Sequence, residues 1–188
     1  MAESAPRPLR ADARANREKI LDAARTAFAA DGPDVNLREI ARRAGVGPGT
    51  IHRHFPTKEA LFGAIIAARF QELTRMARAL RTEHGPGDAF FTLVRATVEQ
   101  AAHNRSLSAA FGSAEGGPEM RAAGEEMTAE LGRLLDDAQG SGAVRGDVDL
   151  ADVHAVLGAV VGLEGQGAVD DAVRARRVEV VLDGLRAR

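Results

Sequence analysis

The sequence predicts an all-α protein of about nine helices, divided into a small N-terminal part and a larger C-terminal part. Three observations favour this fold class. Hydrophobic residues make up 45% of the 188 residues, which is enough to build a folded core. Apolar residues recur at a spacing of three and four throughout, and no alternating strand pattern is found. Glycine and proline clusters separate the helical segments from one another.

The N-terminal part is expected to begin with an arm and a helix. Residues 1–10 contain two prolines and are predicted to form a flexible arm. A helix over 12–30 follows, because its apolar residues repeat on one face. Asp31-Gly32-Pro33 ends this helix, since glycine favours a C-terminal cap and proline cannot continue a helix.

Two short helices are expected next. Asn36 is a good N-cap, and Glu39 stands three residues later, where the second residue of a capping box belongs. Gly45 ends this second helix. Pro48 suits the first turn of a third helix, which is predicted to run to about Phe55.

Six further helices are predicted in the C-terminal part from periodic apolar positions and from capping Thr or Asp residues. Their expected ranges are 58–81, 88–103, 106–113, 120–139, 149–163 and 170–186. The first three helices and the six that follow them are predicted to form two domains, over residues 1–58 and 59–188.

Residues 35–62 have the layout of a helix-turn-helix DNA reader, in which two short helices are joined by a glycine turn. The third helix begins with small residues, so its backbone can approach base edges in a major groove. Polar and basic side chains follow at its tip. The residues predicted to contact DNA are Arg38, Pro48, Gly49, Thr50, His52, Arg53, His54 and Lys58.

The charge distribution agrees with a DNA-binding N-terminal end. The net charge is −2. Residues 1–58 carry 11 Lys and Arg against 7 Asp and Glu, whereas residues 59–188 carry 14 against 20. A basic end on an acidic body fits a protein that meets phosphates at one end. A solvated charged face or a chance fluctuation is the alternative interpretation.

The motif resembles the signature of TetR-type (tetracycline-repressor-like) transcriptional regulators, over roughly residues 15–65. The matching residues are Leu37, Arg38, Ile40, Ala41, Ala44, Gly45, Val46, Thr50, His54, Phe55, Lys58, Glu59 and Leu61. That family usually places Tyr, a phosphate contact, where this chain has His52. The resemblance implies a homodimer on double-stranded DNA with a near-palindromic operator, and a repressor that a small-molecule effector releases.

A cluster of Phe and Met residues is the candidate effector pocket. The C-terminal helices offer few inward polar residues, so a mostly apolar effector is expected. The predicted pocket residues are Phe70, Met76, Phe90, Phe91, Phe111, Met120 and Met127. At helical spacing such residues also suit plain core packing, and this alternative stays open.

The last two helices are the candidate dimer interface. The segment 149–163 is apolar on more than one stripe, so it needs partners on two sides. Glycines within it suggest a close approach of helices. The predicted interface residues, in a four-helix bundle about a two-fold axis, are Val153, Leu157, Gly158, Val161, Gly162, Val178, Val181 and Leu185. Core helices of a monomer are the alternative.

Other functional classes find little support in the sequence. The chain has no Cys, and His52 and His54 face different directions on a helix, so no metal site is expected. No catalytic motif or cofactor-binding loop is found, so an enzyme is not expected. Neither a signal peptide nor a membrane span is predicted, which favours the cytoplasm. Two alternatives remain: an all-α small-molecule-binding protein or enzyme with an incidental helix-turn-helix, and a DNA-binding protein without an effector.

Overall fold

The computed structural model describes residues 7–32, 34–103, 117–164 and 170–187, and within them the fold is all-α. The prediction of the fold class is therefore confirmed. The helix expected over 106–113 lies outside the described residues. The helices within them are α1 (Arg7–Asp31), α2 (Leu37–Ala44), α3 (Pro48–His54), α4 (Lys58–Glu83), α5 (Pro86–His103), α7 (Gly117–Gly140), α8 (Leu150–Glu164) and α9 (Asp171–Leu185).

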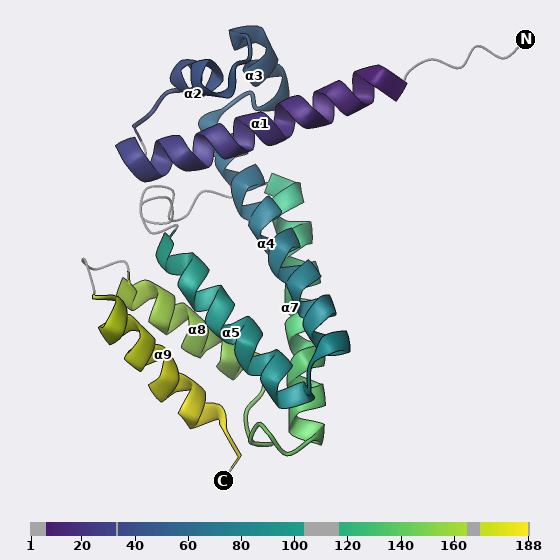
Figure 1. The fold of residues 1–188 in the computed structure, drawn as a ribbon, viewed down its shortest axis with the longest axis vertical. Coiled ribbons are helices and arrows are strands. Elements are labelled where there is room, and N and C mark those ends of the chain that lie inside the picture. Colours follow the sequence, from purple (N-terminus) through teal and green to yellow (C-terminus); the bar gives the residue numbers. More distant parts are fainter. Residues whose placement is uncertain (1–6, 33, 104–116, 165–169, 188) are drawn as a thin grey trace, which may run out of the picture.

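Helices α1 to α3 form a small unit at one end of the molecule, with α1 lying across α2 and α3 (Figure 1). Each helix contributes one apolar stripe to a common core. The fully buried members include Ile20 and Phe28 of α1, Ile40 of α2 and Ile51 of α3. Burial of such large side chains is the main stabilising term for a unit of this size. We call this unit the reading domain.

Local capping fixes the turn between α2 and α3. The Asn36 side chain accepts a hydrogen bond from the Glu39 amide at 2.9 Å, as predicted. Gly45 follows α2 with a φ of 66°, a left-handed conformation that favours glycine. The Val46 amide then donates to the Ala41 carbonyl at 3.0 Å, which closes the end of α2. The chain is thereby turned sharply into α3.

Helix α4 takes part in two cores. Its first turns place Leu61, Phe62 and Ile65 in the small core of the reading domain. Its later turns place Leu73 and Leu80 in the larger core of the body. A domain boundary at residues 58 and 59 therefore stays a prediction, because one continuous helix serves both sides of it.

The body is a layered helical bundle in which α5 separates two pairs of helices (Figure 1). Helices α4 and α7 run parallel on one side of α5, and α8 and α9 lie on the other. The core includes Phe90 and Phe91, whose ring centroids are 5.3 Å apart in an edge-to-face arrangement. The chain returns near its C-terminus to this core, where the Ala187 amide donates to the Ala143 carbonyl at 3.2 Å.

Three helices begin earlier than the sequence indicated: α1, α5 and α7, the last at Gly117 rather than near Met120. Helix α1 begins at Arg7, so the arm predicted over residues 1–10 is wrong for 7–10, and residues 1–6 lie outside the described parts. Helix α5 begins at Pro86, two residues before the expected cap Asp88. The physical reason is the same in all three cases, because Pro8, Pro86 and Pro118 each lie in the first turn. Proline is tolerated in the first turn, where its missing N–H would have had no helical partner.

Candidate nucleic-acid interface

Helix α3 is anchored by two side chains and exposes the rest of its surface. Ile51 is 0% exposed and Phe55, the residue that ends the helix, is 2% exposed. The predicted DNA contacts on this helix all lie at or near the surface. Pro48, Gly49, His52 and Arg53 are exposed, and Thr50 and His54 are half-buried. The buried stripe thus fixes α3 while its polar face stays accessible.

The first residues of α3 have small side chains. A Cβ atom added at Gly49 would meet no atom of the chain within 4 Å, and its φ is not positive. Neither backbone strain nor internal packing therefore requires glycine at this position. With Pro48 beside it, Gly49 leaves the backbone of the first turn open to an approaching partner.

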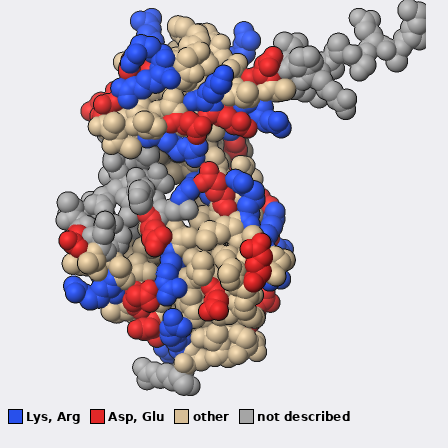
Figure 2. Space-filling model, viewed as in Figure 1, with Lys and Arg blue, Asp and Glu red and all other residues tan. Residues whose placement is uncertain are grey.

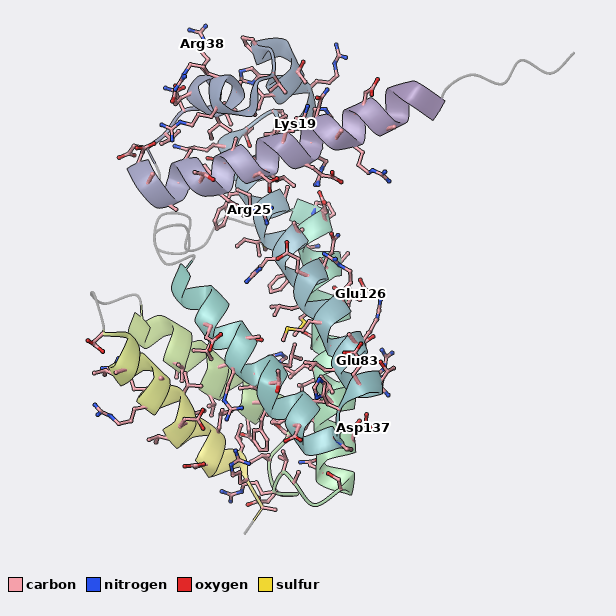
Figure 3. The ribbon with its side chains drawn as sticks, in the orientation of Figure 1. Lys19, Arg25, Arg38, Glu83, Glu126 and Asp137 are labelled. Carbon is pink, nitrogen blue, oxygen red and sulfur yellow. The ribbon has the colours of Figure 1, made fainter. Side chains whose placement is uncertain are left out.

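The arginines of α2 have different surroundings. Arg42 and Arg43 both donate to the Glu39 carboxylate, at 2.7–2.8 Å, and Arg43 also pairs with Asp31 at 2.6 Å. These hydrogen bonds from two guanidiniums lower the pKa of Glu39 to about 2. Arg38 stands in the first turn of α2 and points outward at the end of the molecule (Figure 3). It makes no ion pair within the part of the chain that the structure describes.

Further cations surround α3. Arg53 is exposed and has no ion-pair partner among the described residues. Lys58 is half-buried in the first turn of α4, where the Thr57 side chain caps the helix by accepting from the Ala60 amide at 3.1 Å. Figure 2 shows basic side chains projecting at the tip of this end of the molecule, with acidic side chains beside and below them, and both signs over the body. Such an arrangement suits contacts to phosphates.

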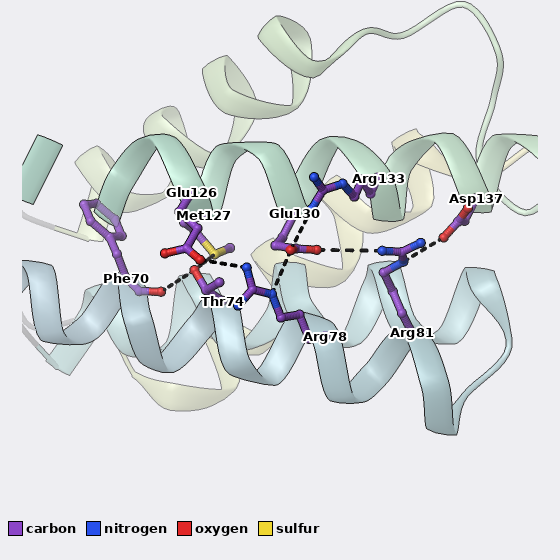
Figure 4. Close-up of polar contacts among 9 residues, drawn as sticks. All are labelled: Phe70, Thr74, Arg78, Arg81, Glu126, Met127, Glu130, Arg133 and Asp137. Carbon is purple, nitrogen blue, oxygen red and sulfur yellow. Dashed lines mark hydrogen bonds and ion pairs between the residues drawn. The ribbon is translucent and has the colours of Figure 1, made fainter. Parts of the chain in front are cut away.

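The predicted effector residues do not gather at one place. Phe90 and Phe91 are buried near the start of α5. That end of α5 lies far from the reading domain (Figure 1). Arg186 stacks 4.3 Å above the Phe91 ring. Phe70 and Met127 instead lie along the contact between α4 and α7 (Figure 4). A Cβ atom at Gly124 would lie 3.4 Å from the Phe70 ring, which places that ring in van der Waals contact with α7.

The remaining members of that set differ in position. Met76 is partly buried against the core of the body, and Met120 is half-buried near the start of α7. Phe111 lies outside the described residues. A separate open hollow lies between α1 and α2 in the reading domain, and it shares no residue with the predicted set; it is lined by Lys19, Asp22, Ala23, Thr26, Arg43 and Ala44.

The structure corrects the residues predicted for the dimer interface. Four of them face the core of their own protomer and are buried there: Val153, Leu157, Val178 and Leu185. Val181 is partly buried against the same core, Gly158 is exposed, and the side chains of 161–162 lie outside the described set. Val153 and Leu157 therefore belong to the stripe of α8 that packs in the core of its own protomer.

The outer faces of α8 and α9 mix small, apolar and charged side chains. On α8 the exposed residues include the small Ala151, Ala155, Gly158 and Ala159, together with Asp152 and His154, and on α9 they include Arg176, Arg177, Glu179 and Asp183. On α9, Val180 is 67% exposed, which is unusual for a large aliphatic side chain in this molecule. No described helix is long and apolar enough to cross a membrane. The described residues also contain no group of three or more His, Asp or Glu side chains placed to hold a metal ion.

Sequence reasoning missed two polar features. Arg17 of α1 contacts both Phe55 and Glu119 of α7, and Glu130 of α7 is buried between arginines. No local pattern could have indicated the first, since Arg17 and Glu119 are 102 positions apart. A charged residue within the apolar run of α7 was the available signal for the second.

Comparisons with known proteins cover both parts of the chain. Residues 20–65 match the family model described as bacterial regulatory proteins of the tetR family. Residues 85–187 match the model of the C-terminal domain of SbtR-like transcriptional regulators. The first match covers the reading domain from residue 20 together with the start of α4, and the second covers α5, α7, α8 and α9.

Individual relatives agree with the family models. A crystal structure of a TetR transcription regulatory protein from Mycobacterium vanbaalenii is 41% identical, covers 96% of this chain and 100% of its own, and has a TM-score of 0.74. The regulator UidR of Escherichia coli is 23% identical over 94% of this chain and 96% of its own. TtgW of Pseudomonas putida is 43% identical over 60 residues, which is 45% of that relative. The chain therefore belongs to the TetR family of helix-turn-helix transcriptional regulators.

Proposed function

We propose that this chain represses transcription as a homodimer that reads double-stranded DNA with α3 and releases it when a small effector binds. The observation that carries the DNA-reading part is the exposed polar face of α3, held by the buried anchors Ile51 and Phe55. Two such helices, related by a two-fold axis, fit successive major grooves of a near-palindromic operator. In this proposal the protein represses transcription by binding DNA in the cytoplasm, without catalysing a reaction.

The residues around α3 take different roles in this proposal. Pro48, Gly49 and Thr50 let the helix approach base edges closely, because none of them projects a long side chain. His54 and Arg53 offer donors at the far end of the helix. Arg38, Lys58 and His52 hold phosphates, His52 through an imidazole N–H where relatives use a tyrosine hydroxyl. Arg38 and Arg53 suit this role because no described carboxylate neutralises them.

The second copy is proposed to cover the outer faces of α8 and α9. Ala155, Gly158 and Ala159 allow a helix to approach closely, and Val180 supplies an apolar side chain that the protomer leaves exposed. Two helices from each protomer would form a four-helix bundle. This assignment replaces the buried core residues that the sequence suggested.

The effector is proposed to bind between α4, α5 and α7, on the side of the bundle that faces the reading domain. Phe70, Met76, Met120 and Met127 are the members of the predicted set that lie along α4 and the first half of α7. Their apolar side chains favour a small apolar effector. Such a ligand lowers operator affinity if it binds the operator-free conformation better than the bound one.

The test begins with DNA selected from a random pool by the wild-type protein. Thr50→Ala and His54→Ala should weaken binding to the selected site by at least several-fold while the melting temperature stays unchanged. Arg53→Ala should also weaken binding and reduce the salt slope by about one. Arg75→Ala is the matched control, since Arg75 is an exposed arginine on α4 that also lacks a described ion-pair partner.

Equal binding by the wild type and the three α3 variants would contradict the proposal. A wild type that selects no DNA but is stabilised by small molecules would favour the alternative of a ligand-binding protein. Specific DNA binding with no ligand response in a broad thermal-shift screen would favour a regulator without an effector.

A further inference from the structure

We propose that Arg17 is a positioning residue that ties the orientation of the reading helix α3 to the first turn of α7 through Glu119. The inference rests on the proposed function, because it concerns how α3 is presented to DNA. It adds a named link between the reading domain and the region where the effector is proposed to bind.

One side of the link is the end of α3. The Arg17 guanidinium carbon lies 5.5 Å from the centroid of the Phe55 ring, within the range of a cation–π contact. Phe55 is 2% exposed, and its amide donates to the Ile51 carbonyl at 2.7 Å. The ring is therefore fixed to α3 by both packing and backbone bonding, so the position of Arg17 is coupled to that of α3.

The other side of the link is the start of α7. Arg17 Nη2 donates to Glu119 Oε1 at 2.5 Å. Glu119 stands in the first turn of α7, where a carboxylate is also favoured by the helix dipole. The next residue is Met120, a member of the proposed effector region. A displacement of the start of α7 would therefore act directly on the Arg17 side chain.

The rest of α7 is fixed to α4 by a network around a buried carboxylate (Figure 4). The Glu130 side chain is 3% exposed and accepts from Arg78 at 2.8 Å and from Arg133 at 2.7 Å. Further along, Arg81 donates to Asp137 at 3.0 Å. Because removing a partner from a buried charge is costly, α4 and α7 are expected to keep their register and to move as one unit.

Two ion pairs from α1 reach the body among the described residues, and they differ in what they contact. Arg25 pairs with Glu72 at 3.4 Å, and Glu72 belongs to α4, whose first turns already pack in the reading domain. Arg17 instead reaches α7, which packs on α4 but shares no core with the reading domain. The Arg17–Glu119 pair therefore couples α1 to the position of α7 in the body, rather than to α4, which takes part in both cores.

The expected consequence concerns the distance between the two half-sites of an operator. In a dimer the body fixes where each reading domain stands, and Arg17 fixes the angle of each domain on the body. Loss of the link should broaden the range of half-site spacings that the dimer accepts. A residue that merely supports folding would change the melting temperature instead.

The experiment uses Arg17→Gln, Glu119→Gln and the double variant in the full-length protein. Operator affinity is measured on the selected site and on the same site with one base pair inserted between the half-sites. The control is Asp137→Asn, which breaks the Arg81–Asp137 pair at the far end of α7. That pair is similarly exposed, at 37% and 45%, compared with 31% and 52% for Arg17 and Glu119.

Both single variants are expected to reduce the preference for the correct spacing by about fivefold, because two half-exposed pairs are lost per dimer. The double variant should lose no more than Arg17→Gln alone, and Asp137→Asn should keep the wild-type preference.

Three results would overturn the inference. An effect of Arg17→Gln without an effect of Glu119→Gln would mean that Arg17 contacts DNA itself. An unchanged spacing preference in both single variants would mean that the Arg17–Glu119 pair does not position α3. An equal loss of preference in Asp137→Asn would mean that any ion pair between α7 and another helix has this effect. If the wild type selects no DNA at all, the proposed function fails instead, and that result is distinct from these three.

Discussion

Helices α3 and α8 are built alike but expose different chemistry. Each is held by a buried stripe, Ile51 with Phe55 in one case and Val153 with Leu157 in the other. The outer face of α3 carries polar and basic side chains, whereas the outer face of α8 carries mainly alanine and glycine, with Asp152 and His154 beside them. A polar, positively charged face suits phosphates and base edges, and a face of small residues suits another helix. The two helices therefore indicate two different partners.

The comparison also explains why one site was easier to recognise. On α3 the buried stripe is apolar and the functional face is polar, so the two can be told apart by residue type. On α8 both faces carry apolar residues, and Asp152 and His154 are the polar exceptions on the outer face, so hydrophobic periodicity alone does not say which face meets the protomer core. The following predictions test that distinction, beginning with the largest expected effect.

Gly158→Leu should convert the dimer into a monomer without unfolding it. A Cβ at Gly158 meets nothing within 4 Å in the protomer, so the leucine would project from the outer face of α8. Loss of the second reading domain should weaken binding to a palindromic site by about 100-fold or more. Sedimentation and gel-shift titration measure the two effects. Gly146→Leu, at an exposed loop glycine with equally open surroundings, is the control. A Gly158→Leu dimer with unchanged affinity would contradict the interface.

Leu157→Ala and Val180→Ala should separate the core stripe from the partner stripe. Leu157 is buried in the body, so its truncation should cost about 2–5 kcal/mol of unfolding free energy. Val180 is 67% exposed, so its truncation should weaken dimerisation and leave the stability of the protomer nearly unchanged. Urea unfolding and sedimentation give the two quantities. The opposite pattern would restore the original assignment from the sequence.

The sequence predicted the reading domain well because local chemistry determines it. Asn36, Gly45 and Pro48 each act on neighbours within a few residues, and the structure places a cap, a left-handed turn and a helix start at those positions. The polar face of α3 followed from residue types alone. The sequence also indicated family membership, because the motif is long and continuous.

The body was less predictable because its contacts join distant parts of the chain. Phe70 and Phe90 are both phenylalanines on the apolar stripe of a helix, so the sequence does not distinguish them. The direction of α5 places its first turns, which include Phe90, at the end of the bundle away from the reading domain (Figure 1). The Arg17–Glu119 pair spans 102 positions. Glu130 is buried because Arg78 and Arg133 surround it, a property that depends on how α4 packs on α7. These contacts and this burial are determined by how the helices pack together, so they cannot be predicted from neighbouring residues in the sequence.

Two glycines of the reading domain should respond to alanine in opposite ways. Gly45 has a φ of 66°, so Gly45→Ala should lower the unfolding free energy by about 1–2 kcal/mol. Gly49 lies in α3 with open space at its Cβ position, so Gly49→Ala should raise stability by up to about 1 kcal/mol while weakening operator binding. Thermal unfolding and DNA titration test both. A Gly49→Ala protein that binds the operator as tightly as wild type would show that close approach at this position is not needed.

The smallest predicted effect concerns Arg42 and Arg43, the arginines of α2 that pair with Glu39. The pKa of Glu39 is lowered to about 2 in the folded protein by hydrogen bonds from Arg42 and Arg43, against an ordinary value of 4.5. A depressed carboxylate pKa stabilises the folded state fully above pH 4.5, and this contribution is lost as the pH falls from 4.5 toward 2. Wild type should therefore melt at a higher temperature than Glu39→Gln at pH 7, and the gap should close across that window.

Melting curves at several pH values between 7 and 2 measure this gap. Glu18→Gln is the control, since Glu18 is an exposed carboxylate of α1 that lies 4.0 Å from Arg14 and caps no arginine pair. Its melting temperatures should follow those of wild type at every pH. A gap between wild type and Glu39→Gln that stayed constant down to pH 2 would mean that the charge of Glu39 does not stabilise the fold. In that case the hydrogen bonds from Arg42 and Arg43 to Glu39 would contribute no pH-dependent stability.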